Sequence, residues 1–173
     1  CQELLFSPLG DWMTLMKPKV GEDAPEFTAE VVGGAYQDGA EVSLKHLRGK
    51  PVVLVFYPKD NTPGCTIQAC AIRDNGDALE SIAYVFGVSV DDAKSHRKFI
   101  DKKNLPYPLL ADTDQKIVQD YGVWVEKSLF GKKYMGIERS SFVIGADGKI
   151  MAVLEKVKPG AHLDQLLEVL KKS

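Results

Sequence analysis

The chain has 173 residues, of which 45% are hydrophobic and 27% are charged, and its formal net charge at pH 7 is −2. This length is typical of one domain, and the apolar fraction excludes a chain that is disordered throughout. A dedicated nucleic-acid-binding protein would show a basic excess, which is absent here. Three cysteines are too few for a disulfide-rich scaffold. No apolar run reaches the ~20 residues that span a bilayer.

Residues 1–19 differ in pattern from the rest, and we treat them as an N-terminal extension of a domain formed by residues 20–173. Their apolar side chains recur at helical spacing, which favours a short helix packed on the domain. A disordered tail and a surface-seeking segment are the alternatives. The chain begins with Cys1, which could carry the lipid of a bacterial lipoprotein, but the lipobox that would establish this lies upstream of the given sequence. We expect a cytoplasmic protein. The alternatives are a periplasmic or membrane-anchored protein with a lipidated Cys1, and an organellar protein that has lost a targeting peptide.

The first part of the domain is predicted to be rich in β-structure. Phe27 to Val32 has the composition of an extended segment, and Val42 to Leu47 contains Ser43, which can cap a short helical turn. Val52 to Phe56 is a continuous run of β-branched, aliphatic and aromatic residues. Such a run is typical of a strand that is buried on both faces of a sheet.

Beyond this strand, the pattern alternates between helices and strands. The expected elements are a helix over 63–81, a strand from Tyr84 to Val90, a helix capped by Asp91 or Asp92 and running to Lys103, a strand from Leu109 to Ala111, a helix from Asp114 to Tyr121, a hairpin of Ser141–Ile144 and Ile150–Leu154, and an amphipathic helix from Leu163 to Lys172. This order predicts an α/β fold with a mixed central sheet flanked by helices. It matches a thioredoxin-like fold with an N-terminal extension.

The segment from Tyr57 to Cys70 follows directly on the buried strand, and ligands of α/β proteins bind at the carboxyl ends of strands. Thr62 is a good N-cap and Pro63 is favoured at the first helical position, so Gly64 and Cys65 fall in the first helical turn. Free backbone N–H groups and the positive end of the helix dipole stabilise a thiolate there. A small buried apolar role for Cys65 is the alternative, and the neighbouring proline and glycine argue against it.

Cys70 follows Cys65 by five positions, which leaves three interpretations. A zinc site would need two more ligands, but His46, His96 and His162 are dispersed singly along the chain. A thioredoxin-type exchange motif has two residues between its cysteines, whereas four separate these two. The remaining interpretation is a redox nucleophile with a resolving partner.

The motif Pro58-x-x-x-Thr62-x-x-Cys65 is the active-site pattern of the peroxiredoxins. The sequence around it resembles the peroxiredoxin Q branch, also called bacterioferritin comigratory protein. The resemblance covers about residues 20–173, with Glu26 where aspartate is more usual. It is carried by Val20–Phe27, Thr62–Thr66, Gln68–Cys70, Arg73-Asp74, Tyr121–Trp124 and Arg139–Ile144.

The resemblance implies a thiol-dependent peroxidase that reduces hydrogen peroxide and organic hydroperoxides. Cys65 would be the peroxidatic cysteine, whose thiolate attacks the peroxide and becomes a sulfenic acid. Cys70 would be the resolving cysteine, which condenses with that sulfenic acid to an intramolecular Cys65–Cys70 disulfide. Thioredoxin or a similar dithiol would then restore both thiols.

The resemblance also implies how the site stabilises the charge that moves across the breaking O–O bond. Thr62 would supply a hydroxyl group, Gly64 and Cys65 their backbone N–H groups, and Arg139 its guanidinium group. Pro58 would shield the thiolate from water. Without the resemblance, Arg139 would be interpreted as a solvated surface charge and Thr62 as a helix cap.

No metal, haem or flavin is expected, and no nucleic-acid partner. We expect a monomer, with a dimer as the alternative, and contact with a membrane only if Cys1 is lipidated. Two other functions are weighed against the peroxidase. A thiol–disulfide oxidoreductase on the same fold would be expected to carry Cys-x-x-Cys, and a redox sensor or scaffold would not need the complete set of Pro58, Thr62, Cys65 and Arg139.

Overall fold

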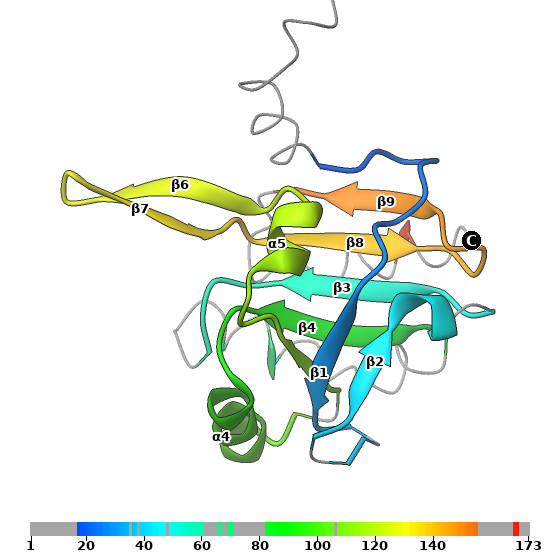
Figure 1. Ribbon diagram of the computed structural model, residues 1–173, viewed down its shortest axis with the longest axis horizontal. Helices are drawn as coiled ribbons and strands as arrows, with labels where there is room; N and C mark the ends of the chain where they lie inside the picture. The colour runs from blue at the N-terminus through cyan, green and yellow to red at the C-terminus, as the bar shows by residue number, and fades with distance from the viewer. Residues whose placement is uncertain are drawn as a thin grey trace, which may run out of the picture.

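The computed structural model describes residues 17–34, 36–37, 39–47, 49–60, 66, 69–70, 82–105, 107–155 and 168–169. In this part of the chain, seven strands form one sheet in the order β2-β1-β5-β4-β3-β8-β9, and two more form a separate β6–β7 ribbon (Figure 1). The strands are β1 (Thr28–Val32), β2 (Glu41–Ser43), β3 (Val52–Phe56), β4 (Tyr84–Ser89), β5 (Leu109–Ala111), β6 (Trp124–Leu129), β7 (Lys132–Ile137), β8 (Ser140–Ile144) and β9 (Ile150–Leu154). The helices are the 3-10 turn η2 (Leu44–Leu47), α4 (Ala93–Lys103) and α5 (Lys116–Asp120).

Strand β3 lies inside the sheet, and all five of its residues are buried. It pairs in parallel with β4 and antiparallel with β8, and β4 pairs in parallel with β5. The remaining pairs of this sheet are antiparallel. The predicted mixed sheet of a thioredoxin-like fold is therefore confirmed, and β3 is the buried strand that the sequence predicts.

Alternate residues of β3 face two different cores, as the period of a strand requires. Leu54 and Phe56 belong to a core that includes Val118 and Tyr121 of the α5 region. Val53 and Val55 belong to the other core, which includes Phe99 of α4. Burial of each such side chain contributes about 1.5–3 kcal/mol relative to exposure. Helices therefore cover both faces of the sheet.

Helix α4 begins and ends where its cap residues predict. The carboxylate of Asp92 accepts a hydrogen bond from the backbone N–H of Ser95 at 2.8 Å, which makes Asp92 the N-cap. Asn104 ends the helix in the left-handed conformation with φ of 53°, a conformation that asparagine tolerates better than most residues.

Helix α5 is shorter than the predicted Asp114–Tyr121, because Gln115 has the left-handed conformation with φ of 62° and the helix begins only after it, at Lys116. The two carboxylate oxygens of Asp112 accept hydrogen bonds from the backbone N–H groups of Ile117 and Val118, at 3.1 and 2.9 Å. A helix leaves its first N–H groups unpaired. Asp112 satisfies two of them from the end of β5.

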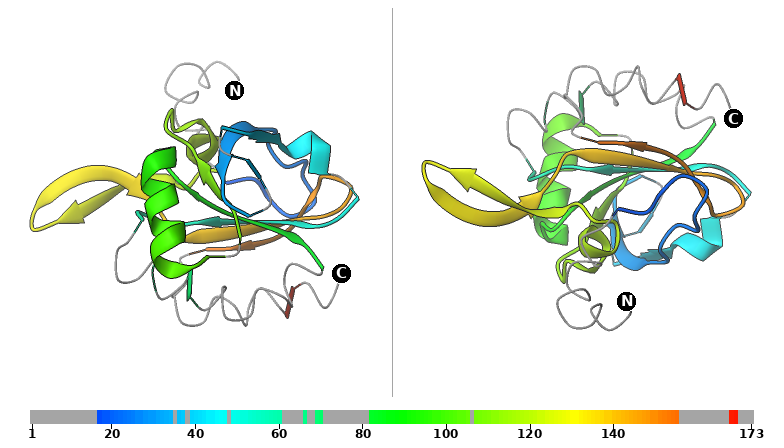
Figure 2. Two further views of the ribbon diagram at one scale, coloured as in Figure 1. Left: turned by 90° about the horizontal axis from the view of Figure 1, so that it is seen from below. Right: turned by 90° about the horizontal axis from the view of Figure 1, so that it is seen from above.

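The β6–β7 ribbon is an element that the sequence pattern did not predict. It extends away from the body of the sheet in Figures 1 and 2. Phe130 and Gly131 form its turn with φ of 53° and 80°, as a two-residue hairpin turn requires. Asn-Gly or Asp-Gly would have signalled such a turn, whereas Phe-Gly does not. Phe130 is 96% exposed at the tip.

Several predicted segments lie wholly or mostly outside the described residues. Of the predicted helix over 63–81, Thr66, Ala69 and Cys70 are described, and all three are helical. Of the predicted helix from Leu163 to Lys172, the described residues 168–169 are helical. The boundary between residues 1–19 and 20–173 stays a prediction. Lys17 lies 2.9 Å from Glu138, which joins the end of that extension to the domain.

Among the described residues, we find no helix with the length and apolar character needed to cross a membrane.

The pKa of Asp112 gives a test of this packing. Burial, with a smaller contribution from the neighbouring Asp114, raises this pKa to about 6, against the two backbone N–H bonds that lower it. The unfolded chain loses this proton near pH ~3.9, so the folded state holds the proton to a higher pH. The contribution of Asp112 to stability therefore falls as the pH rises from about 4 to about 6.

We expect the free energy of unfolding of the wild type to decrease over this pH window relative to Asp112→Asn, measured by urea denaturation from pH 4 to 7. Asparagine does not titrate. It has one side-chain acceptor oxygen where aspartate has two, so one of the two N–H bonds is lost, and the resulting loss of unfolding free energy does not change with pH. If the difference in unfolding free energy between the two proteins did not change with pH, the raised pKa of Asp112 would be contradicted.

Candidate active site

The described part of the predicted site lies at the carboxyl end of β3. Pro58 is half-buried, two residues after the strand ends. Phe56 pairs with Ser140, the first residue of β8, so the half-buried Arg139 precedes β8 at this same edge of the sheet. Strand pairing thus brings the chain segments of Pro58 and Arg139 together, although 81 positions separate them in the sequence.

The other predicted site residues are only partly described. Cys70 is helical and half-buried, and its thiol is free. Thr62, Gly64 and Cys65 lie outside the described residues.

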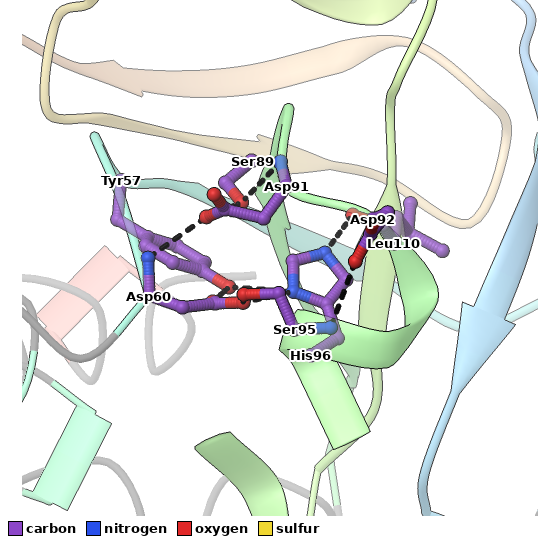
Figure 3. A network of polar contacts seen from close by, with 8 residues as sticks. All are labelled: Tyr57, Asp60, Ser89, Asp91, Asp92, Ser95, His96 and Leu110. Atoms are coloured by element: carbon purple, nitrogen blue, oxygen red, sulfur yellow. Dashed lines mark hydrogen bonds and ion pairs between the residues drawn. The ribbon is translucent and has the colours of Figure 1, made fainter. Parts of the chain in front are cut away.

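A polar network that the sequence analysis missed lies beside this loop (Figure 3). Its centre is Asp60, whose residue exposure is only 7% although it is in a loop. Its carboxylate accepts hydrogen bonds from the hydroxyl groups of Tyr57 at 2.6 Å and Ser95 at 2.8 Å. The Nδ1 atom of His96 lies 2.7 Å from the same carboxylate. Three side chains therefore point at one buried carboxyl group.

His96 is fully buried and is fixed at both ring nitrogens. Its Nε2 lies 2.8 Å from the backbone carbonyl of Leu110 in β5. A carbonyl oxygen only accepts, so Nε2 carries a hydrogen and donates it to Leu110. The imidazole ring therefore connects helix α4, strand β5 and the loop that follows β3.

Tyr57 is the donor in its hydrogen bond to Asp60. Burial raises the pKa of its hydroxyl group well above the usual value, and the nearby carboxylate of Asp60 raises it further. The phenol therefore keeps its proton. Gly87 of β4 makes room for this ring, because a Cβ atom there would lie 3.1 Å from a ring carbon of Tyr57 and 2.6 Å from a methyl group of Leu109.

The backbone of the same loop is also tied down. The N–H of Asp60 donates to the carboxylate of Asp91 at 2.8 Å, and the hydroxyl group of Ser89 donates to the same oxygen at 2.8 Å. The backbone N–H of Tyr57 donates to the carbonyl of Val88. Side-chain and main-chain bonds thus fix the loop at Tyr57 and Asp60.

Asp60, Asp91 and His96 are the right residue types for a metal site, and their ligand atoms lie within 4.8 Å of one another. Each of these atoms already has a protein partner: Tyr57 and Ser95 for Asp60, Ser89 and the Asp60 backbone for Asp91, and Asp60 for His96. A metal ion would have to replace these bonds. We therefore interpret the cluster as a hydrogen-bonded network of the protein itself.

A pocket of about 250 Å³ opens beside Pro58 and continues along the β6–β7 ribbon. Its lining includes the half-buried Trp124 of β6 and Met135 and Ile137 of β7. Lys127 and Tyr134 add polar groups to the same wall. The ribbon that the sequence pattern did not predict therefore forms one wall of the space next to the predicted site.

Sequence signals for the network were weak. Asp60 appears as one more polar residue in a loop, and His96 as an isolated histidine in an amphipathic helix. The bonds of Asp60 and His96 join three different segments, the loop after β3, helix α4 and strand β5, which only the folded structure brings together.

Comparison with known proteins places the chain in a family. The model of the AhpC/TSA family matches residues 20–153. A putative peroxiredoxin bcp from Coxiella burnetii is 45% identical over 153 residues, which cover 88% of this chain and 98% of the relative. The peroxiredoxin Bcp of Escherichia coli K12 is 44% identical over 154 residues, covering 88% of this chain and 96% of the relative.

Solved structures agree with these relatives. A mutant PrxQ of Xylella fastidiosa superimposes with a TM-score of 0.82 at 30% identity, covering 91% of this chain and 98% of the other. The peroxidoxin BcpB of Mycobacterium tuberculosis gives a TM-score of 0.76 at 34% identity, covering 90% and 97%. The chain therefore belongs to the AhpC/TSA family and, within it, to the peroxiredoxin Q (Bcp) branch of thiol peroxidases.

Proposed function

We propose that this thiol peroxidase reduces hydrogen peroxide and organic hydroperoxides with Cys65 as its nucleophile. The observation that supports this most is the pairing of Phe56 with Ser140, which brings the Pro58 loop and Arg139 to one edge of the sheet. The chain then continues from Pro58 toward Thr62 and Cys65. The segment that leads to the proposed nucleophile and the proposed cation thereby start from one edge of the sheet, although they are distant in the sequence.

In the proposed first step, the thiolate of Cys65 attacks the terminal oxygen of the hydroperoxide. The S–O bond forms as the O–O bond breaks, and the alcohol or water leaves after it takes up a proton. Cys65 is oxidised by two electrons to a sulfenic acid, and the peroxide is reduced. The thiol of Cys70 then displaces water from the sulfenic acid and forms the Cys65–Cys70 disulfide. A thioredoxin-type dithiol reduces this disulfide and returns both cysteines to thiols.

Arg139 is proposed to stabilise the negative charge that moves onto the leaving oxygen. A fixed cation at a partly buried site acts more strongly than one in water, because the surroundings screen it less. Thr62 and the backbone N–H groups of Gly64 and Cys65 are proposed to donate hydrogen bonds to the same oxygens. Pro58, which is half-buried, is proposed to keep water from the thiolate.

The pocket beside Pro58 supports the inclusion of organic hydroperoxides. Trp124, Met135 and Ile137 offer it an apolar wall that suits an alkyl or aryl group. Hydrogen peroxide needs no such wall.

The other sequence expectations stay predictions: a monomer rather than a dimer, a cytoplasmic location, and no membrane contact unless Cys1 is lipidated. Cys1 lies outside the described residues.

Cys65→Ser is expected to abolish peroxide turnover, because the hydroxyl group of serine does not ionise near neutral pH and cannot replace the thiolate. The change is nearly isosteric, so the circular dichroism spectrum should be unchanged. Turnover is measured as peroxide consumption with thioredoxin and its reductase. Cys1→Ser is the matched control and should keep the wild-type rate. A folded Cys65→Ser protein with a tenth of that rate would refute the nucleophile assignment.

Arg139→Ala is expected to slow the oxidation of the reduced enzyme by about 10²–10³-fold, the effect of removing one charge-stabilising donor in other enzymes. Stopped-flow measurement of the oxidation rate constant checks this. Arg97→Ala is the matched control, since Arg97 lies on α4 and pairs with Asp101 of the same helix at 3.8 Å. Equal rates for Arg139→Ala and the wild type would show that Arg139 takes no part in the reaction.

Disulfide formation is expected to unwind the start of the helix that contains Cys70. In an uninterrupted helix, Cα atoms five positions apart are roughly 8–9 Å apart, whereas a disulfide requires about 4.4–6.8 Å. Amide hydrogen exchange should therefore be faster over residues 64–74 in the disulfide form than in the reduced form. Equal protection in both forms, with the Cys65–Cys70 bond verified by mass spectrometry, would contradict this.

A further inference from the structure

We propose that His96 is a positioning residue for the peroxidatic cysteine, because it holds Asp60 and thereby fixes the loop that leads from β3 to Thr62 and Cys65. This inference rests on the proposed function of Cys65. His96 touches neither the peroxide nor the reacting sulfur in this account. It acts through the loop.

The starting point is the unusual burial of Asp60. A loop residue with a charged side chain is normally exposed, yet the side chain of Asp60 is 4% exposed. It follows the exposed Lys59 and precedes Thr62 by two positions and Cys65 by five. A buried carboxyl group needs hydrogen-bonding partners to offset the loss of its hydration. Asp60 has three such partners (Figure 3).

Of these partners, His96 is the one that transmits a fixed position from elsewhere in the fold. Tyr57 belongs to the same loop, and the hydroxyl group of Ser95 can rotate to follow a moving carboxylate. The ring of His96, by contrast, cannot follow it, because Nε2 is bound to the Leu110 carbonyl at 2.8 Å. The distance of 2.7 Å from Nδ1 to Asp60 thus locates the loop relative to strand β5.

Stability alone does not explain such a network. Replacing a buried polar pair by apolar side chains of similar size is often neutral or stabilising, so burying the pair is not an efficient way to gain stability. Hydrogen bonds are directional, however, and a rigid ring bound at both nitrogens fixes a position in a way that apolar packing does not. The network lies at the start of the segment that leads to Thr62 and Cys65, and this place fits a role in fixing the position of that segment.

The consequence is specific to one half of the catalytic cycle. Attack on the peroxide requires the thiolate and its charge-stabilising groups to be held in place, and a displacement of about 1 Å can cost ~100-fold in rate. Reduction of the disulfide starts from the form in which we expect the helix around Cys70 to be unwound. The position of the Asp60 loop therefore matters for oxidation and much less for reduction.

Two variants of His96 separate the bond to Asp60 from the bond to Leu110. The amide nitrogen of asparagine lies near the position of Nδ1, so His96→Asn keeps a hydrogen-bonding group beside Asp60 and loses the donor for Leu110. The amide nitrogen of glutamine lies near the position of Nε2, so His96→Gln keeps the donor for Leu110 and loses the hydrogen-bonding group beside Asp60. Each variant loses one buried hydrogen bond, and their urea midpoints should fall by similar amounts.

The experiment measures both half-reactions of the full chain by stopped flow: oxidation of the reduced enzyme by hydrogen peroxide, and reduction of the disulfide by dithiothreitol. We expect His96→Gln to oxidise about 10–100-fold more slowly than the wild type, His96→Asn to lie within about threefold of it, and both to be reduced at the wild-type rate. Asp60→Asn, which keeps the size of the side chain, should behave like His96→Gln. If His96→Gln does not fold, the oxidation rate of Asp60→Asn tests the proposal in its place.

Wild-type oxidation rates in both His96→Gln and Asp60→Asn would overturn the proposal, as would equal slowing in the two His96 variants. Failure of the proposed function looks different. In that case the wild type itself would consume no peroxide, or Cys65→Ser would consume it at the wild-type rate.

Discussion

Burial of β3 on both faces is the constraint on which the rest of the structure depends. All five residues from Val52 to Phe56 are buried, and their side chains alternate between two cores. A shift of one residue would exchange the two faces of the strand, so its register is fixed. The position of the next residues follows from this, because Tyr57 is still bound to Val88 by its backbone. The active-site loop therefore begins at a defined point of the fold.

Around this point, the molecule combines two kinds of polar organisation. Arg139 comes from the segment before β8, and we propose that it acts on the charge of the substrate. Asp60 and His96 are turned inward, and each buried polar side-chain atom of the described residues has a hydrogen-bond partner. In this account, one set of groups performs the chemistry and the other determines where the chemistry takes place. The β6–β7 ribbon adds the third component, an apolar wall next to Pro58.

The sequence predicts those features whose cause is local or periodic. The apolar run of β3, the Asp92 and Asn104 caps of α4 and the β8–β9 hairpin all have a signal within a few residues, and the structure has each of them. Features without a clear local signal were missed. The β6–β7 ribbon turns at Phe130-Gly131 without the usual turn residues, and α5 begins only after the left-handed Gln115. The link between Asp60 and His96 spans 36 positions. Family resemblance supplied the proposed role of Arg139, a residue that the local pattern alone would have assigned to the surface.

The most direct test of the account is to trap the first oxidised form of the enzyme. Reduced Cys70→Ser protein is treated with one equivalent of hydrogen peroxide in the presence of dimedone, which alkylates sulfenic acids, and the adduct is located by tandem mass spectrometry. The account predicts a single dimedone adduct on Cys65 in nearly stoichiometric yield, and none on Cys1. An adduct on Cys1, or unmodified Cys65 after the peroxide has been consumed, would contradict it.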